Sequence, residues 1–283
     1  MRTAIFILLT ILAFPVFAAK APFGKLQEEQ KFQDYTVRIY FDKDASSGCF
    51  EVLRSGKQVY FHGGQFFGVG GVTPESAQTP ARTPIKMGQS ITSDKQPNLL
   101  VTEWTSGNHC CTTFHIFEIG QTFKLIANIE ALYFETSEFR DLRGDGNLEL
   151  VTADWTFAYW NVACCSSHSP TVILRYQGGR YLPDLEMMKK PTPPQAALEE
   201  WAKSFRGKST EPDMVNLWPT PPEMWQKMLD LIYTGNMAAA WRLLDLSWPA
   251  RPGKKKFVKE FKKQLGTSPY YAAITGPTFQ LGK

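Results

Sequence analysis

The chain has 283 residues, of which 43% are hydrophobic and 20% charged, and its formal net charge is +4. This balance excludes a collagen, a coiled coil, a long disordered tail and a multi-span membrane protein. The charge is too small to indicate a nucleic-acid-binding protein. At roughly 150 residues per domain, the length predicts two domains.

The N-terminus predicts a signal peptide. Arg2 precedes an apolar run over residues 4–17, and Val16 and Ala18 are compact residues at the −3 and −1 positions of a cleavage site after Ala18. The alternative is a membrane anchor, which needs roughly 20 apolar residues, and Pro15 interrupts this run. We therefore expect a periplasmic or secreted protein that has no transmembrane segment after cleavage; its oligomeric state stays open.

Residues 19–185 predict a β-rich domain. Stretches rich in β-branched and aromatic residues, several of them alternating with polar ones, predict strands, and Ser55-Gly56 between two of them predicts a hairpin turn. Segment 64–97 is rich in Gly, Pro, Ser and Thr and predicts a loop. The predicted strands are residues 35–41, 49–54, 57–61, 99–104, 113–118, 123–128, 150–154 and 171–176.

Residues 186–283 predict a small helical domain. Trp225, Met228, Leu229 and Ile232 follow the i, i+3, i+4, i+7 spacing of one helical face. The predicted helices are residues 195–205, 223–233, 237–246 and 254–265. Charge changes along the chain as well, with a net −3 over residues 19–175 and +6 over residues 176–283. The predicted fold class is therefore α+β, an N-terminal antiparallel β domain followed by a small C-terminal α-helical domain.

An internal repeat appears when the sequence is shifted by 51 residues. Residues 99–105, LLVTEWT, then align with residues 150–156, LVTADWT, so that Glu103 matches Asp154. A pair of adjacent cysteines follows each aligned segment, residues 110–111 in the first copy and 164–165 in the second. The copies span about residues 88–118 and 139–176, and a period near 50 residues is typical of one four-stranded β blade.

The stretch before the second copy, residues 141–149, reads DLRGDGNLE. This D-x-x-G-D-G-x-x-E pattern resembles the loop of FG-GAP or VCBS-type repeats, of the kind present in uncharacterised bacterial secreted proteins. The resemblance covers about residues 88–176 and implies propeller-blade-like repeats. The predicted strands are too few for a closed propeller, which needs about four four-stranded blades.

In that family the loop often binds Ca²⁺ through acidic oxygens, so the resemblance implies Asp141, Asp145 and Glu149 as ligands and calcium as a cofactor. Arg143 departs from the pattern, because a guanidinium has no lone pair to give. The alternative is a tight turn stabilised by glycine, in which Arg143 pairs with Asp141 or Asp145. The equivalent stretch in the first copy, residues 90–98, is a degenerate version of the loop.

The cysteines predict structural disulfides, because an exported protein matures in an oxidising compartment. Their connectivity stays open between links across the pairs and links within them. The odd count leaves one thiol over, and Cys49, which has no neighbouring cysteine, is the first candidate. The alternative is a zinc or copper site. The paired cysteines are Cys110, Cys111, Cys164 and Cys165, and the histidines near them are His109, His115 and His168.

Two further groups of residues are candidates for function. Glu103 and Asp154 are carboxylates at matching repeat positions, and convergent carboxylates can hydrolyse a glycosidic bond. Exposed aromatic rings can stack on sugars or anchor a partner protein; packing in the β core is the alternative. The aromatic candidates for binding are Trp155, Phe157, Tyr159 and Trp160.

Together these features predict an exported, disulfide-stabilised, non-catalytic binding or interaction module of the cell envelope. Its expected partner is an envelope protein or a glycan, and no nucleic acid. A glycan hydrolase that uses the paired carboxylates and a metal or redox protein that uses the cysteine pairs stay open as alternatives. The sequence contains no G-x-S-x-G, H-E-x-x-H, P-loop or G-x-G-x-x-G motif, and we predict no catalytic residue.

Overall fold

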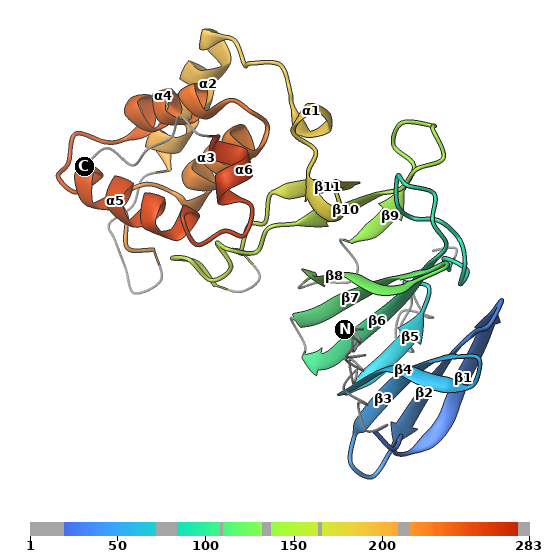
Figure 1. The fold of residues 1–283 in the computed structure, drawn as a ribbon. Coiled ribbons are helices and arrows are strands. Elements are labelled where there is room, and N and C mark those ends of the chain that lie inside the picture. The colour runs from blue at the N-terminus through green and yellow to red at the C-terminus, as the bar shows by residue number, and fades with distance from the viewer. Residues whose placement is uncertain are drawn as a thin grey trace, which may run out of the picture. The chain divides into compact units, whose positions relative to one another are not determined.

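The computed structural model describes residues 20–71, 84–107, 110–131, 137–163, 166–208 and 216–276, with the backbone alone at residues 106, 107, 110 and 111. These residues form three four-stranded antiparallel sheets and six helices (Figure 1). The predicted α+β class is confirmed. The predicted signal peptide, residues 1–18, lies outside the described residues.

The chain divides into two compact units, Met1–Gly63 and Gly64–Lys283. The N-terminal unit is built on one sheet in the order β1-β2-β3-β4, whose last residue, Gly64, already belongs to the second unit. Tyr35, Val37 and Ile39 alternate with more exposed residues and are buried on one face, as the period of a strand requires. The strands are β1 (Lys25–Phe32), β2 (Tyr35–Asp42), β3 (Ser47–Arg54) and β4 (Lys57–Gly64).

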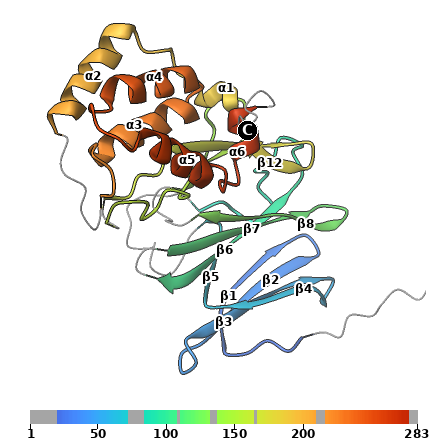
Figure 2. The same cartoon turned by 90° about the vertical axis from the view of Figure 1, so that its left-hand side faces the viewer.

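The second unit contains two more sheets of the same design. Each is a meander in which neighbouring strands along the chain pair with each other, in the orders β5-β6-β7-β8 and β9-β10-β11-β12 (Figure 2). The first contains β5 (Phe66–Val69), β6 (Asn98–Gly107), β7 (Cys110–Ile119) and β8 (Phe123–Ala131). The second contains β9 (Glu138–Arg140), β10 (Glu149–Ala153), β11 (Thr171–Gln177) and β12 (Arg180–Pro183).

Helices make up the rest of the second unit. Pro222 stands at the first turn of α3. A backbone N–H at this position has no hydrogen-bond partner within the helix, so a proline there costs no hydrogen bond. The apolar face predicted for this helix is confirmed, because Trp225, Met228, Leu229 and Ile232 are all buried. The helices are α1 (Leu185–Met188), α2 (Gln195–Gly207), α3 (Pro222–Tyr233), α4 (Met237–Ser247), α5 (Lys254–Leu265) and α6 (Tyr271–Thr275).

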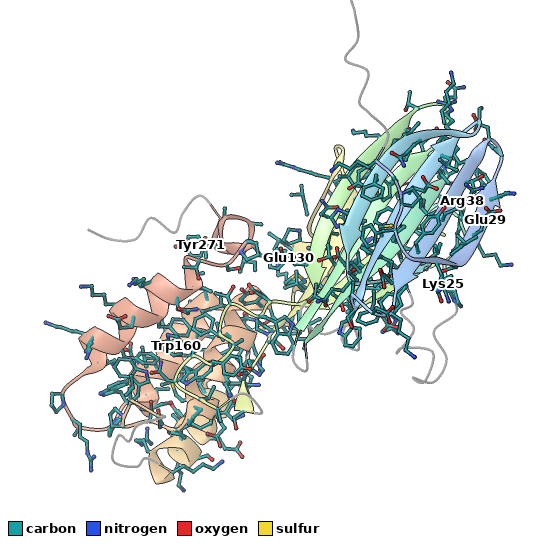
Figure 3. All side chains as sticks on the ribbon, turned by 90° about the horizontal axis from the view of Figure 1, so that it is seen from below. Lys25, Glu29, Arg38, Glu130, Trp160 and Tyr271 are labelled. Carbon is teal, nitrogen blue, oxygen red and sulfur yellow. The ribbon has the colours of Figure 1, made fainter. Side chains whose placement is uncertain are left out.

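One hydrophobic core runs through the second unit. It joins Leu100 and Phe114 from the first sheet, Leu150 and Val172 from the second, and the buried faces of the helices. Figure 3 shows Trp160 among the side chains of the helices. Because sheets and helices share this core, residues 64–283 form one compact unit. The domain boundary expected at residue 185/186 stays a prediction.

The eight predicted strands and four predicted helices are all present, with ends shifted by up to three residues. The sequence patterns did not predict the strands β1, β5, β9 and β12 or the short helices α1 and α6. The strand β1 reads KLQEEQKF and is a polar edge strand, so it lacks the apolar alternation on which the predictions relied. Residues 66–69, which form β5, lie in the segment predicted as a loop.

Candidate functional site

The two copies of the repeat fold alike. The matched strands, β6 and β10, are each the second strand of a four-stranded meander. The turns before them carry the same hydrogen bonds at the 51-residue shift. Asn98 Oδ1 accepts from Ile91 N at 2.9 Å, and Glu149 Oε2 accepts from Leu142 N at 3.1 Å.

A second hydrogen bond repeats in the same way. Asp94 Oδ1 accepts from Gln96 N at 3.1 Å, and Asp145 Oδ1 accepts from Asn147 N at 2.9 Å. Each turn also has a residue with positive φ at the next position, Lys95 at 58° and Gly146 at 81°. The degenerate stretch 90–98 therefore keeps the backbone of the turn although most of its side chains differ.

The carboxylates of the second turn contact backbone N–H groups and guanidinium groups. Asp141 accepts three hydrogen bonds, from the N–H groups of Gly144, Asp145 and Gly146 at 2.6–3.1 Å. Asp145 has a pKa below its ordinary value, chiefly because the N–H of Asn147 donates to its carboxylate, with a smaller contribution from the nearby arginines. The turn is thus stabilised by donors of its own chain, and whether calcium also binds stays a prediction.

Arg143 is the cation at the centre of this turn. Its Nη2 lies 2.7 Å from Asp184 Oδ2, and its Nη1 lies 3.6 Å from Oε1 of Glu149, whose side chain is fully buried. Arg175 on β11 approaches Glu149 and Asp145 at 4.0 Å. The expected pairing with Asp141 or Asp145 is therefore replaced by pairing with Glu149 and Asp184.

This ion-pair network positions α1. Asp184 is the N-cap residue of the helix, and its Oδ1 accepts from Met187 N at 3.1 Å while Oδ2 binds Arg143. An N-cap carboxylate satisfies N–H groups that have no partner within the helix. The turn predicted as a calcium loop thus reaches, through Arg143, the start of a helix forty residues farther along the chain.

A cavity of about 400 Å³ lies beside α1, within the second unit. Its size falls in the range of small-molecule sites. Its walls come from β11, α1, the proline-containing linker that follows α1, α2, α3 and the turn after α3. The lining residues are Pro170, Thr171, Ile173, Met187, Met188, Lys190, Pro191, Pro193, Trp201, Lys227, Asp230, Leu231, Tyr233, Thr234 and Asn236.

The linker wall of the cavity is fixed by the buried Asn236. Its Nδ2 donates to the carbonyl of Lys190 at 3.1 Å, and its Oδ1 accepts from the Thr192 hydroxyl at 2.7 Å. The N–H of Lys190 also donates to the carbonyl of Thr234 at 3.2 Å. These bonds hold residues 190–192 against the turn that follows α3, so this wall is already formed without a ligand.

Asp154, the repeat equivalent of Glu103, supports the α3 wall from inside the protein. It is 3% exposed and accepts hydrogen bonds from the Tyr233 and Ser268 hydroxyls and, at 2.8 Å, from Thr156 N. Burial and the charge of Asp154 raise the pKa of Tyr233. For the same reasons the pKa of Tyr270 rises to about 12.

Two charged groups of the cavity, those of Lys227 and Asp230, lie on the face of α3 that lines it. Lys227 places its Nζ 4.4 Å from the ring centroid of Trp201 on α2, a cation–π contact. Asp230, one turn later, places Oδ1 2.7 Å from Nε2 of His168. The cavity therefore combines an aromatic ring, an ammonium group and a carboxylate that is held by an imidazole.

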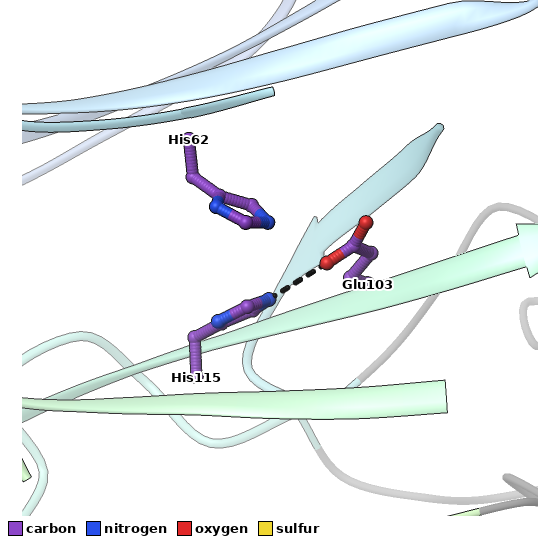
Figure 4. Close-up of side chains that lie close together, drawn as sticks. All are labelled: His62, Glu103 and His115. Atoms are coloured by element: carbon purple, nitrogen blue, oxygen red, sulfur yellow. Dashed lines mark hydrogen bonds and ion pairs between the residues drawn. The ribbon is translucent and has the colours of Figure 1, made fainter. Parts of the chain in front are cut away.

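Glu103 contacts a different set of groups in the first sheet. Its Oε2 lies 2.9 Å from His115 Nε2 (Figure 4). Nδ1 of the same ring lies 2.9 Å from Asn128 Oδ1 on β8. His62, also drawn there, belongs to the N-terminal unit. Both nitrogens of the His115 ring are hydrogen bonded and the residue is 2% exposed. Neither Glu103 nor Asp154 lines the cavity.

The four aromatic candidates separate into core and surface. Phe157 is buried against Trp225 and Phe261, with ring centroids at 5.8 and 5.0 Å, and Trp160 is partly buried and packs on the same cluster. Trp155 is partly buried, and Tyr159 is 57% exposed. The ring of Phe157 thus faces the core, and Tyr159 is the candidate whose ring faces solvent.

Cys49 is a free, buried thiol whose sulfur accepts a hydrogen bond from Phe23 N at 3.4 Å. Burial raises the pKa of this thiol. The side chains of Cys110, Cys111, Cys164 and Cys165 and all of His109 lie outside the described residues, so their disulfides stay a prediction. Of the histidines near them, His115 binds Glu103 and His168 binds Asp230, on different elements.

The cavity residues Trp201, Lys227 and Asp230 were not among the residues that the sequence predicted for a site. They lie on two helices, and only the one-turn spacing of Lys227 and Asp230 opposite the apolar face of α3 was visible in the sequence.

Comparisons of the chain with protein-family models, with curated proteins and with solved structures give no match. The resemblance to FG-GAP or VCBS-type repeats therefore stays a hypothesis. Its basis is the sequence pattern and the matched turns. Among the described residues, the helices are all too short or too polar to cross a membrane.

Proposed function

We propose that this protein is a non-catalytic binding module of the cell envelope and that the cavity beside α3 holds its ligand. Export rests on the predicted leader, and the repeat assignment rests on the sequence resemblance. The observation that carries the proposal is the cavity itself, about 400 Å³ in volume, with walls that the protein's own hydrogen bonds fix. A protein or glycan of the envelope remains the expected source of the ligand.

Support for binding over hydrolysis comes from the two carboxylates. Glu103 lies against an imidazole within the first sheet, and Asp154 accepts from two hydroxyls and one N–H in the core. A glycosidase needs its two carboxyl groups on opposite sides of one substrate bond. Here each carboxylate stabilises a separate part of the fold.

The test is a steric block of the cavity. Thr171 is exposed and lines the cavity, so Thr171→Trp should fill its entrance, whereas Gln177→Trp places the same ring on an exposed position of the same strand, outside the lining. Ligand-observed NMR on the chain without its leader, with a panel of glycan fragments, short peptides and organic acids, should give hits for wild type and Gln177→Trp. Those hits should disappear with Thr171→Trp. Hits that survive Thr171→Trp, or a panel with no hits, would contradict the proposal.

A further inference from the structure

The chemical class of the ligand follows from the charge balance of the cavity, provided that the cavity is the binding site proposed above. Two of its lining residues carry an ammonium group, Lys190 and Lys227. Among the described residues that line it, Asp230 has the only carboxylate, and His168 already holds one of its oxygens. The lining therefore has a positive excess.

The ammonium group of Lys227 has no carboxylate partner within the part of the chain that the structure describes. The ammonium group lies over the face of Trp201, which attracts a cation through the ring quadrupole and leaves its hydrogen-bond donors unused. A lysine offers three donors and no acceptor. The group that completes this site must bring an acceptor, and a negative charge satisfies it best.

The other polar groups of the lining are largely used by the protein. The Thr234 hydroxyl donates to the carbonyl of Asp230 at 2.7 Å, the Asn236 amide fixes the linker, and the Tyr233 hydroxyl binds Asp154. The remaining walls are apolar: Ile173, Met187, Met188, Pro191, Pro193 and Leu231. A ligand thus meets an apolar enclosure with a cationic group on α3.

We propose that the cavity binds a small organic carboxylate that has an apolar body. The carboxylate would accept hydrogen bonds from Lys227, and the apolar body would lie against Trp201 and the methionine and proline walls. The two ammonium groups and one carboxylate of the lining leave an excess of one positive charge, which matches the single charge of a carboxylate better than the about −1.5 to −2 of a phosphate group. Fatty acids and aromatic acids share this chemistry, and the probes below distinguish them.

The experiment is a titration of the chain without its leader, followed by calorimetry and by tryptophan fluorescence, with matched pairs of probes. The pairs are octanoate with octanol, and phenylbutyrate with phenylbutanol. Each pair keeps the apolar body and changes only the anionic group. We expect the carboxylate of at least one pair to bind at least about tenfold more tightly than its alcohol, and the pair that responds identifies the aliphatic or the aromatic body.

Three variants test the role of Lys227. Lys227→Met should remove the preference for the carboxylate over the alcohol, whereas Lys227→Arg should keep most of it. Lys259→Met is the matched control, since Lys259 is an exposed lysine of α5 outside the cavity, and it should bind as wild type does. Circular dichroism and thermal unfolding confirm that each variant is folded.

The outcomes separate this inference from the proposed function. If alcohols and carboxylates bind equally well, or if Lys227→Met keeps the preference, the cavity is a binding site but the carboxylate inference is wrong. If these probes do not bind while other compounds of the NMR panel do, the inference is also wrong and the proposed function stands. If nothing binds in either experiment, both are wrong.

Discussion

The two copies of the repeat share a backbone but differ in the groups that their side chains contact. In the first copy, the buried Asn98 accepts from Ile91 N and from the Thr92 hydroxyl, and Glu103 lies against His115 within the same sheet. In the second, Glu149 and Asp154 stand at the matching positions and reach outside their sheet, toward α1 through Arg143 and toward α3 through Tyr233.

This difference shows how a repeated turn acquires a new role. The hydrogen bonds from side chain to backbone are retained, because they stabilise the turn itself. Arg143 and Glu149 stand where the first copy has Thr92 and Asn98, so the second turn is charged. Through Arg143 it forms an ion pair with Asp184, the N-cap residue of α1. The first copy stabilises a sheet, while the second also supports two walls of the cavity.

The largest effect is expected for Arg143→Met. It leaves the buried Glu149 and Asp184 without their closest cation, and removal of one partner of a buried ion pair costs about 3–5 kcal/mol. We expect the lower end of that range, because Arg175 remains near Glu149. Urea unfolding measures the change.

The matched change in the first copy is Thr92→Val, which removes the hydroxyl contacts with Asp94 and Asn98 and should cost only about 1 kcal/mol. Equal losses for Arg143→Met and Thr92→Val would mean that the charged network adds nothing to the second copy.

A smaller effect is expected for Asp154→Asn, about 2 kcal/mol in the free energy of unfolding, because the carboxylate that accepts from Tyr233 and Ser268 becomes a partial donor. Ligand affinity should fall as well, since Tyr233 lines the cavity. Glu103→Gln should also reduce stability but leave affinity unchanged. If Glu103→Gln reduces the affinity and Asp154→Asn does not, the first copy and not the second supports the cavity.

High pH tests the effect of Asp154, in the second copy, on two tyrosines of the helical part of the chain. The folded-state pKa of Tyr270 is about 12, above the ordinary 10.0, because burial and the charge of Asp154 disfavour its anion, and the pKa of Tyr233 is raised in the same way. The stability from these groups is full below pH 10 and is lost as the pH rises toward 12. Phenolate absorbance during unfolding should follow this loss. The loss should be weaker in Asp154→Asn, and an identical profile would contradict the coupling.

Backbone strain gives a still smaller difference. Lys95 and Gly146 occupy the same turn position with φ of 58° and 81°, a region that side chains with a Cβ disfavour. Lys95→Gly should stabilise the protein by up to about 1 kcal/mol, and Gly146→Ala should destabilise it by about 1 kcal/mol. A Cβ at Gly146 meets open space, so thermal unfolding of Gly146→Ala reports the backbone alone. If neither Lys95→Gly nor Gly146→Ala changes the free energy of unfolding, backbone strain at this position does not distinguish the two turns.

Calcium is expected to have the smallest effect. Ca²⁺ requires about six to eight oxygen ligands. The carboxylate of Asp141 already accepts three N–H bonds, and Arg143 places a positive charge beside Glu149. Addition of calcium, or its removal with EDTA, should therefore leave the melting temperature unchanged. A clear increase with calcium would favour Asp141, Asp145 and Glu149 as ligands, as the family resemblance implies.

Sequence patterns predicted the central strands and the long helices because these elements bury one regular face. They did not predict β1, whose polar residues lie at a sheet edge, or the division of the chain at residue 63/64, which depends on which faces share a core. The cavity was also not predictable, since Trp201 and Lys227 meet only after α2 and α3 have packed. Arg143 was identified as an exception to the loop pattern, but its partner Asp184 is distant in sequence.

The linker that closes the cavity has a consequence for the thermodynamics of binding. Pro191, Pro193 and Pro194 restrict its backbone, and Asn236 bonds it to the turn after α3 before any ligand arrives. Little conformational entropy remains to be lost there when the cavity is occupied, so most of the contact energy is available as affinity. Exchange of the Lys190 amide hydrogen, which is bonded to the Thr234 carbonyl, should accordingly be slow in the free protein and should change little on binding.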